Sequence, residues 1–248
     1  MPSGEKYAVV TGNERGIGRA LTIDLASQGY NVIVAWFESE EDGKEVVAEC
    51  VKLGVQAYLT YHDVRDMQSV IDLKNFAIEK LGTNLAVFIN NAGMSIAGTL
   101  VDQDPADYNT VISTDLIGSM NCAHVFAPLM IENGEGRLIN IGSCSGIRST
   151  AGNNAYGIAK AGIMGLTRGL ALELGKYAIT VNNICPGYIN TKRSAEFCGP
   201  EMIESIKKST ALNSIGIEQD IVEAMNFFLR SPRVTGQSVM VNGGSVMN

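Results

Sequence analysis

The sequence predicts an α/β fold in which a parallel sheet is covered by helices on both faces. Short runs rich in β-branched and apolar residues alternate with longer amphipathic segments, which is the pattern of repeated βαβ units. The strand-like runs are apolar throughout rather than alternating, as expected for strands buried on both faces. Glycine is frequent, at 27 of 248 residues. It has no repeating period, so a collagen-like chain is excluded.

The predicted elements follow one another without a break. Strands are expected at residues 7–11, 31–35, 56–61, 85–90, 137–141, 180–184 and 238–241, and helices at 17–28, 40–53, 66–81, 105–132, 155–175 and 218–230. No linker, repeat or low-complexity tract divides the chain, so residues 1–248 are interpreted as one domain. Residues 188–215 contain no strand-like run. A segment of this length is usually functional, and we expect it to cover the substrate.

Composition excludes several classes of protein. The formal net charge is −7, with no basic stripe, which argues against a nucleic-acid-binding protein. No apolar run approaches the roughly 18 residues of a membrane span, and the N-terminus has no apolar signal core. The five cysteines form no CxxC pair, which fits a reducing cytosol, and we expect a cytoplasmic protein. His62 and His124 are the only histidines, so we predict no metal site.

A glycine-rich turn directly follows the first predicted strand. The segment TGNERGIG at 11–18 leads into an amphipathic helix. Glycines in this place let the chain turn sharply and let backbone N–H groups approach a pyrophosphate at the helix N-terminus. A tight turn that merely needs positive φ is the alternative explanation. The position after the first strand favours nucleotide binding, although the spacing is GxxxGxG rather than GxGxxG.

Further motifs, taken with this turn, resemble the short-chain dehydrogenase/reductase family over essentially the whole chain. They are NNAG at 90–93, Ser143 with YGIAK at 156–160, PGYINT at 186–191, and TGQ at 235–237 with NGG at 242–244. The resemblance implies a Rossmann-like, doubly wound sheet of seven parallel strands in the order 3-2-1-4-5-6-7. It also implies a nicotinamide cofactor, a carbonyl or alcohol substrate, and a homotetramer with helices 105–132 and 155–175 at one interface.

The catalytic prediction rests on Tyr156, Lys160 and Ser143. Tyr156 and Lys160 are four residues apart on a predicted helix, so they share a face. A free tyrosine has a pKa near about 10, and a neighbouring ammonium stabilises the phenolate and lowers that pKa. Such a pair can give a proton to a carbonyl oxygen or take one from an alcohol. The resemblance assigns Ser143 to the same oxygen, while the hydride belongs to the cofactor.

One position departs from the family pattern. Asp115, in TDLIG at 114–118, stands where the family has Asn in an NLxG motif. In the family, the main-chain carbonyl of that residue helps to hold a water near the catalytic lysine. We expect Asp115 to keep this relay role. We also expect a carboxylate near Lys160 to raise the pKa of the lysine and to alter the pH profile.

The sequence favours NADP(H) over NAD(H). No carboxylate appears at the end of the second strand until Glu38, and Arg15 stands in the turn where basic residues of NADP-preferring members meet the 2′-phosphate. NAD remains possible, because the acidic run at 38–42 would repel a phosphate. The resemblance assigns cofactor contacts to Gly12, Asn13, Arg15, Gly16, Ile17, Gly18, Trp36, Asp63, Val64, Asn90, Ala92, Gly93, Tyr156, Lys160, Pro186, Gly187, Ile189 and Thr191.

Within the family the sequence most resembles bacterial 3-oxoacyl-[acyl-carrier-protein] reductases, which dock an acidic carrier against basic residues. Residues 130–136 contain no base, and Leu172 lies where an arginine is usual. The missing positive charge puts carrier docking in doubt. A hydroxysteroid or another small alcohol is the alternative substrate, with Ser95, Cys144 and Tyr188 expected at the substrate. A non-catalytic nucleotide sensor is a more distant alternative, which the intact catalytic set disfavours.

Overall fold

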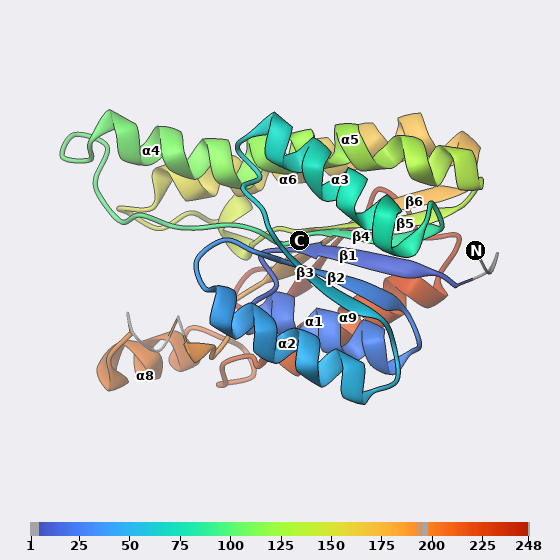
Figure 1. Ribbon diagram of the computed structural model, residues 1–248. Coiled ribbons are helices and arrows are strands. Elements are labelled where there is room, and N and C mark those ends of the chain that lie inside the picture. Colours follow the sequence, from blue (N-terminus) through green and yellow to red (C-terminus); the bar gives the residue numbers. More distant parts are fainter. Residues whose placement is uncertain (1–4, 193, 195–197, 248) are drawn as a thin grey trace.

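The centre of the protein is a parallel sheet (Figure 1). In the computed structural model, which describes residues 5–192, 194 and 198–247, seven strands pair in the order β3-β2-β1-β4-β5-β6-β7. This is the predicted order, and each predicted strand is confirmed to within two residues at either end. The strands are β1 (Tyr7–Thr11), β2 (Asn31–Trp36), β3 (Ala57–Tyr61), β4 (Leu85–Asn90), β5 (Gly136–Ile141), β6 (Ile179–Pro186) and β7 (Ser238–Val241).

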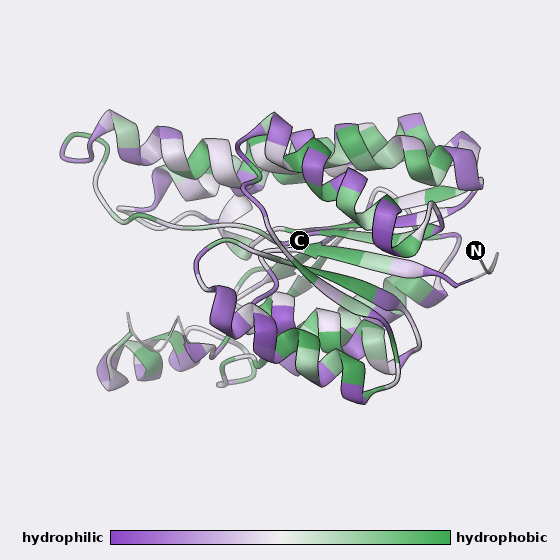
Figure 2. Ribbon diagram, viewed as in Figure 1, coloured by the Kyte–Doolittle hydropathy of each residue, from purple (hydrophilic) through white to green (hydrophobic). Residues whose placement is uncertain are grey.

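Helices cover both faces of this sheet. One face carries α1 (Gly16–Ser27), α2 (Glu40–Lys52) and α9 (Glu218–Arg230), and the other carries α3 (Met67–Leu81), α5 (Gly118–Asn133) and α6 (Asn154–Leu174) (Figure 1). Most of the strand residues are apolar, and polar residues gather on the outer helix surfaces (Figure 2). The helices therefore bury an apolar stripe against the sheet, which is the arrangement that the amphipathic pattern predicts.

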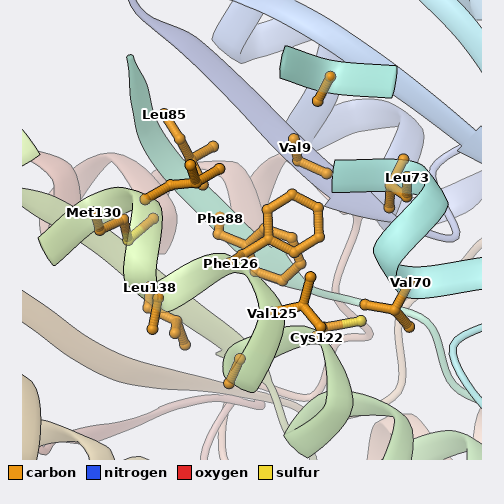
Figure 3. Close-up of a cluster of buried hydrophobic side chains, with 14 of the residues drawn as sticks. Val9, Val70, Leu73, Leu85, Phe88, Cys122, Val125, Phe126, Met130 and Leu138 are labelled. Carbon is orange, nitrogen blue, oxygen red and sulfur yellow. The ribbon is translucent and has the colours of Figure 1, made fainter. Parts of the chain in front are cut away.

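Each face of the sheet has its own core. Beneath α3 and α5, the rings of Phe88 and Phe126 stack with their centroids 4.5 Å apart (Figure 3). On the opposite face, Leu21 and Leu25 of α1 pack with Phe228 of α9 against the strands. Both cores lie behind the carboxyl ends of the strands. Their close packing keeps the carboxyl edge of the sheet rigid, and the motif residues follow the strands at this edge.

The segment predicted as one helix over 105–132 is interrupted. α4 (Pro105–Ile112) leads into a π-helical turn at Ser113–Ile117, and α5 begins at Gly118. A Cβ atom on Gly118 would lie 2.5 Å from Cγ2 of Val64, so the helix approaches its neighbour closely at this point. π-Helical turns occur frequently at functional sites. This one contains Asp115.

The segment expected to cover the substrate has structure of its own. Within residues 188–215, α8 (Pro200–Lys208) forms a helix, and an isolated bridge pairs Ile189 with Gly216. Residues 193 and 195–197 belong to this segment and lie outside the described residues. In the described part of the chain, no helix combines the length and apolarity needed to cross a membrane.

Candidate active site at the carboxyl ends of the strands

The turn after β1 needs its glycines for two different reasons. Gly12 and Gly16 adopt φ values of +62° and +54°, which other residues rarely adopt. Gly18 is needed for space, since a Cβ atom there would lie 2.5 Å from Nδ2 of Asn91 and would also collide with the carbonyl oxygen of Gly12. Ile17 lies beside them and packs on the core beneath α1. The turn therefore brings the N-terminus of α1 to the strand edge, where backbone N–H groups can meet a pyrophosphate.

Asn13 holds the turn from within rather than facing a ligand. Its side chain is fully buried, with Nδ2 donating to Oγ1 of Thr22 at 2.9 Å and to the carbonyl of Ile33 at 3.1 Å. Its Oδ1 accepts from the backbone N–H of Ala35 at 2.8 Å. These bonds fasten the turn to α1 and β2. The cofactor contact of Asn13 stays a prediction, and with the side chain occupied in this way we expect it to come from the backbone.

The loop after β4 braces the same turn. Nδ2 of Asn91 donates to the carbonyls of Thr11 and Gly12, both at 2.9 Å. In return, Oγ1 of Thr11 accepts from the N–H groups of Asn91 and Ala92, both at 3.0 Å. Sequence reasoning missed Thr11 and Asn91 as site residues. The signal was present, because both belong to the motifs that predicted nucleotide binding.

The side chain of Asn90 points into the protein interior. Its Nδ2 donates to Oδ1 of Asn140 at 2.8 Å and to the carbonyl of Ser119 at 3.3 Å, and the side chain is buried. It joins β4 to β5 and α5. The cofactor contact of Asn90 stays a prediction, and we expect it to come from the backbone, because both amide hydrogens of the side chain already have partners inside the protein.

Lys160 lies at the centre of the catalytic group. Lys160 is 4% exposed, and its Nζ lies 5.4 Å from the centroid of the Tyr156 ring. Nζ donates to the carbonyl of Ile141 at 3.0 Å and forms an ion pair with Oδ2 of Asp115 at 3.1 Å. A Cβ atom on Gly93 would lie 3.2 Å from this Nζ. α6 and the π-helical turn therefore bring the predicted Tyr156, Lys160 and Asp115 together.

Both the carboxylate and the main-chain carbonyl of Asp115 accept hydrogen bonds. Its carboxylate accepts from the N–H of Met94 at 2.8 Å through Oδ1, while its main-chain carbonyl accepts from Oγ of Ser119 at 2.7 Å. Burial lowers the pKa of Lys160, but the ion pair with Asp115, together with the smaller effect of Tyr156, outweighs it, and the net pKa of the lysine is raised. The expectation that a carboxylate at this position reaches Lys160 agrees with this geometry.

Ser143 is positioned by the end of β5. Its Oγ accepts from the N–H of Ser145 at 3.1 Å, which starts a short 3₁₀ turn at Cys144–Gly146. A Cβ atom on Gly146 would lie 2.8 Å from the main-chain carbon of Lys160, so this turn lies directly against α6. Burial raises the pKa of the Cys144 thiol, which keeps it protonated near neutral pH.

Two loops frame the entrance. Oγ of Ser95 donates to Oδ1 of Asn153 at 2.9 Å, which ties the loop after β4 to the start of α6. Beyond Pro186 at the end of β6, Gly187 packs so closely that its Cβ would lie 2.8 Å from Cβ of Asn242. Thr191 then reaches the glycine turn, where its Cγ2 is 3.6 Å from the place of a Cβ atom on Gly16. Tyr188 and Ile189 connect these points, with Ile189 buried.

The region beside the glycine turn, beyond the end of β2, is acidic. Arg15 forms ion pairs with Glu38 at 3.3 Å and Asp42 at 3.7 Å. Glu14 is buried beside it, with Oε1 accepting from the N–H groups of Phe37 at 3.3 Å and Glu38 at 3.1 Å. Sequence reasoning missed Glu14, because the family motif gave no reason to expect a carboxylate in the turn.

The predicted adenine-side residues lie at or just beyond the carboxyl ends of β2 and β3. Trp36 packs edge-on against Tyr61 with ring centroids 5.1 Å apart, and Val64 is buried. Asp63 forms an ion pair with Arg65 at 2.7 Å, which lowers the pKa of the carboxyl. These side chains follow β2 and β3, so the carboxyl edge of the sheet carries the predicted nucleotide and catalytic residues side by side.

A dinucleotide fits the described residues. The glycine turn presents backbone at a helix N-terminus, Gly93 lets the loop after β4 pass close to Lys160, and Oε2 of Glu14 is buried without a hydrogen-bond partner. Together with the doubly wound sheet, this site defines a nicotinamide-dependent oxidoreductase acting on alcohol or carbonyl groups.

Comparison with known proteins identifies the family. The model of the family described as short chain dehydrogenase matches residues 6–199, and the chain belongs to this family. A 3-oxoacyl-[acyl-carrier-protein] reductase (FabG) of Staphylococcus aureus is 34% identical over 244 residues, covering 98% of each chain. The short-chain reductase NovJ of Streptomyces niveus is 35% identical over 98% of this chain and 94% of its own. Acetoin dehydrogenase from Enterobacter cloacae has a TM-score of 0.88 at 28% identity, covering 98% and 96% of the two chains.

Proposed function

We propose that the protein interconverts a ketone and a secondary alcohol, with Tyr156 as the general acid and base. The observation that carries the proposal is the buried ammonium of Lys160, 5.4 Å from the centre of the Tyr156 ring. A positive charge at this place favours the phenolate, which a tyrosine needs for proton transfer near neutral pH. When bound, the nicotinamide cofactor supplies or accepts the hydride.

The chain's own residues divide the proton chemistry among them. In reduction, the hydroxyl of Tyr156 gives its proton to the carbonyl oxygen, and in oxidation the phenolate takes the proton of the alcohol. The hydroxyl of Ser143 donates a hydrogen bond to the same oxygen and orients it. Lys160 stays in place through the carbonyl of Ile141 and the carboxylate of Asp115.

Asp115 supports proton movement in two ways in this proposal. Its main-chain carbonyl accepts from Oγ of Ser119 and keeps a second lone pair for a water beside Lys160. Its carboxylate acts directly on the lysine at 3.1 Å. This second contact is what distinguishes the site from one with asparagine, because an amide carries no charge.

The substrate is proposed to be a free ketone or alcohol rather than one tethered to a carrier protein. The similarity to 3-oxoacyl reductases supports a 3-oxo substrate. Two observations argue against a carrier protein. Leu172 is 86% exposed at a position where docking an acidic carrier would need a cation. Within residues 130–136, the exposed Glu135 is acidic and already forms an ion pair with Lys6 at 2.7 Å. A hydroxysteroid or small secondary alcohol is the second candidate, because neither needs a cationic docking surface.

The proposed assembly is a homotetramer. Apolar residues are exposed on the helices expected at one interface, with Ile117 and Met120 near the start of α5 and Ile158 on α6. On the same exposed side of α6, a Cβ atom on Gly165 would meet nothing within 4 Å. A helix with a small residue between exposed apolar ones can be approached closely by another helix.

Replacing Tyr156 by Phe tests the mechanism. The variant keeps the ring and loses the hydroxyl, so kcat should fall by about 10²–10⁴-fold. The dissociation constant of the dinucleotide should stay within about threefold, since only one hydroxyl among the many predicted cofactor contacts is lost. Steady-state assays with a panel of ketones and alcohols, paired with calorimetric titration, measure both. A fully active variant would sink the mechanism. A wild-type protein that binds dinucleotide and turns over nothing in the panel would favour the sensor alternative.

A further inference from the structure

Glu14 brings a carboxylate to the end of β2 by an unusual route. In doubly wound dinucleotide-binding proteins, an acidic residue about 20 positions beyond the glycine turn binds the hydroxyls of the adenosine ribose. Here the chain leaving β2 has no carboxylate until Glu38. The side chain of Glu14, from the turn itself, reaches this place and accepts from the N–H groups of Phe37 and Glu38.

The second oxygen of this carboxylate lacks a partner within the described protein. Oε1 of Glu14 takes both backbone hydrogen bonds, whereas Oε2 is buried and accepts none. The whole residue is 5% exposed. A buried carboxylate oxygen without a donor is costly, and the donor that suits it is a hydroxyl or N–H of a ligand. A ribose 2′-hydroxyl is such a donor, and a 2′-phosphate is not.

The nearby cations do not offset this carboxylate. Arg15 is paired with Glu38 and Asp42, and Arg65 with Asp63. The side chain of Arg15 is 38% exposed and already pairs with two carboxylates, and such partly exposed pairs are weak, so this arginine alone would not decide which cofactor binds. Glu14 has more influence on which cofactor binds, because two backbone hydrogen bonds fix its position. Its charge lies in the interior, where repulsion of a phosphate is poorly screened.

We infer that Glu14 selects NAD(H) over NADP(H) by accepting a hydrogen bond from the ribose 2′-hydroxyl and repelling a 2′-phosphate. The inference rests on the proposed function, which requires that a nicotinamide dinucleotide binds. It reverses the NADP(H) preference predicted from Arg15. A carboxylate that sequence reasoning did not consider stands where the phosphate would have to enter.

Calorimetric titration of the wild-type protein tests the inference directly. NADH should bind at least about tenfold more tightly than NADPH, and 5′-AMP more tightly than adenosine 2′,5′-bisphosphate, because a carboxylate–hydroxyl bond is replaced by repulsion between anions. The mononucleotides report on the adenosine end alone, without catalysis. NADPH binding as tightly as NADH would overturn the inference. Binding of neither dinucleotide would instead overturn the proposed function.

A pair of variants assigns the effect to Glu14. Glu14→Gln keeps the shape and removes the charge, so the NADPH-to-NADH ratio of dissociation constants should fall by about tenfold. Glu45→Gln makes the same change of charge at an exposed position on α2 and should leave the ratio unchanged. Equal effects of the two substitutions would show that net charge, not Glu14, sets the preference. The wild-type comparison stands even if Glu14→Gln folds poorly.

Discussion

At the scale of single residues, the contact between Asp115 and Lys160 changes what the catalytic lysine can do. An ammonium with a carboxylate at 3.1 Å exerts a weaker field on a neighbouring phenol than an ammonium without one. The same carboxylate keeps Lys160 charged in a buried place, where an unpaired ammonium tends to lose its proton. The two effects oppose each other: the pair protects the charge of the lysine and reduces its influence on Tyr156.

Asp115→Asn should shift the pH dependence of alcohol oxidation to lower pH. Asparagine can still accept from the N–H of Met94, but it no longer neutralises Lys160, whose raised pKa falls. The ammonium, while it persists, then favours the Tyr156 phenolate more strongly. The measurement is kcat/KM for alcohol oxidation against pH. Asp107→Asn on α4 is the control, and a curve identical to that of the wild type would remove the proposed influence of the carboxylate.

For single residues, the sequence predicted which side chains form the catalytic group better than it predicted which way other side chains point. Lys160, Tyr156 and Asp115 do converge, because a spacing of four on a helix and a motif after a strand are local facts. Asn13 and Asn90 turned inward, since the hydrogen bonds that hold them come from strands distant in sequence. Glu14 was overlooked for the same reason. Its partners follow β2, and no local pattern indicates that contact.

At the scale of elements, the strands were predictable, whereas the interruption of one helix was not. Each strand is a short apolar run between turns, and its length and its β-branched residues distinguish it from a helix. The helix over 105–132 continues its apolar pattern through the π-helical turn at Ser113–Ile117. One extra residue in a turn leaves that pattern almost intact, so the interruption that presents Asp115 to Lys160 is visible only in three dimensions.

The junction of β3 with α5 contains a buried histidine that should make the protein sensitive to acid. His62 follows β3, and its Nε2 lies 3.8 Å from Sγ of Cys122 on α5. Burial lowers the pKa of His62 from 6.5 to about 4. Between these values the unfolded chain binds a proton that the folded protein excludes. The stabilisation is complete above pH 6.5 and is lost as the pH falls through 4, amounting to about 3 kcal/mol.

His62→Gln should therefore flatten the loss of stability between pH 6.5 and 4. Glutamine is polar and does not titrate, so the variant has no proton to exclude. Urea unfolding at several pH values measures the free energy of unfolding. The matched control is His124→Gln on the exposed side of α5, which should keep the wild-type slope. If both variants lose stability in acid as steeply as the wild type, His62 is not the sensitive group.

At the scale of the whole molecule, the exposed face of α6 predicts the assembly. Gly165→Arg adds a long side chain where a single chain has open space, and it exchanges glycine for a better helix former. In a tetramer built through α6, the same side chain obstructs the facing helix. Light scattering should show a tetramer for the wild type and a dimer or monomer for this variant. Gly199→Arg, at another open position, should leave the mass unchanged.

A wild-type protein that is monomeric at micromolar concentration would contradict the proposed tetramer. A tetrameric Gly165→Arg variant would place the contacts elsewhere. The free energy of unfolding of the variant helps to interpret the result. A stable but smaller particle shows that the substitution acted on assembly rather than on folding, because nothing within the described chain lies near that side of Gly165.

The bonds between Thr11 and Asn91 have a consequence for how the protein is made. These residues are 80 positions apart, and β1 pairs with β4 across a similar distance. A nascent chain that has emerged only as far as β3 has its glycine turn, but not the loop that fastens it. The nucleotide site therefore forms only after about 90 residues have left the ribosome, and a pairing so distant in sequence closes slowly.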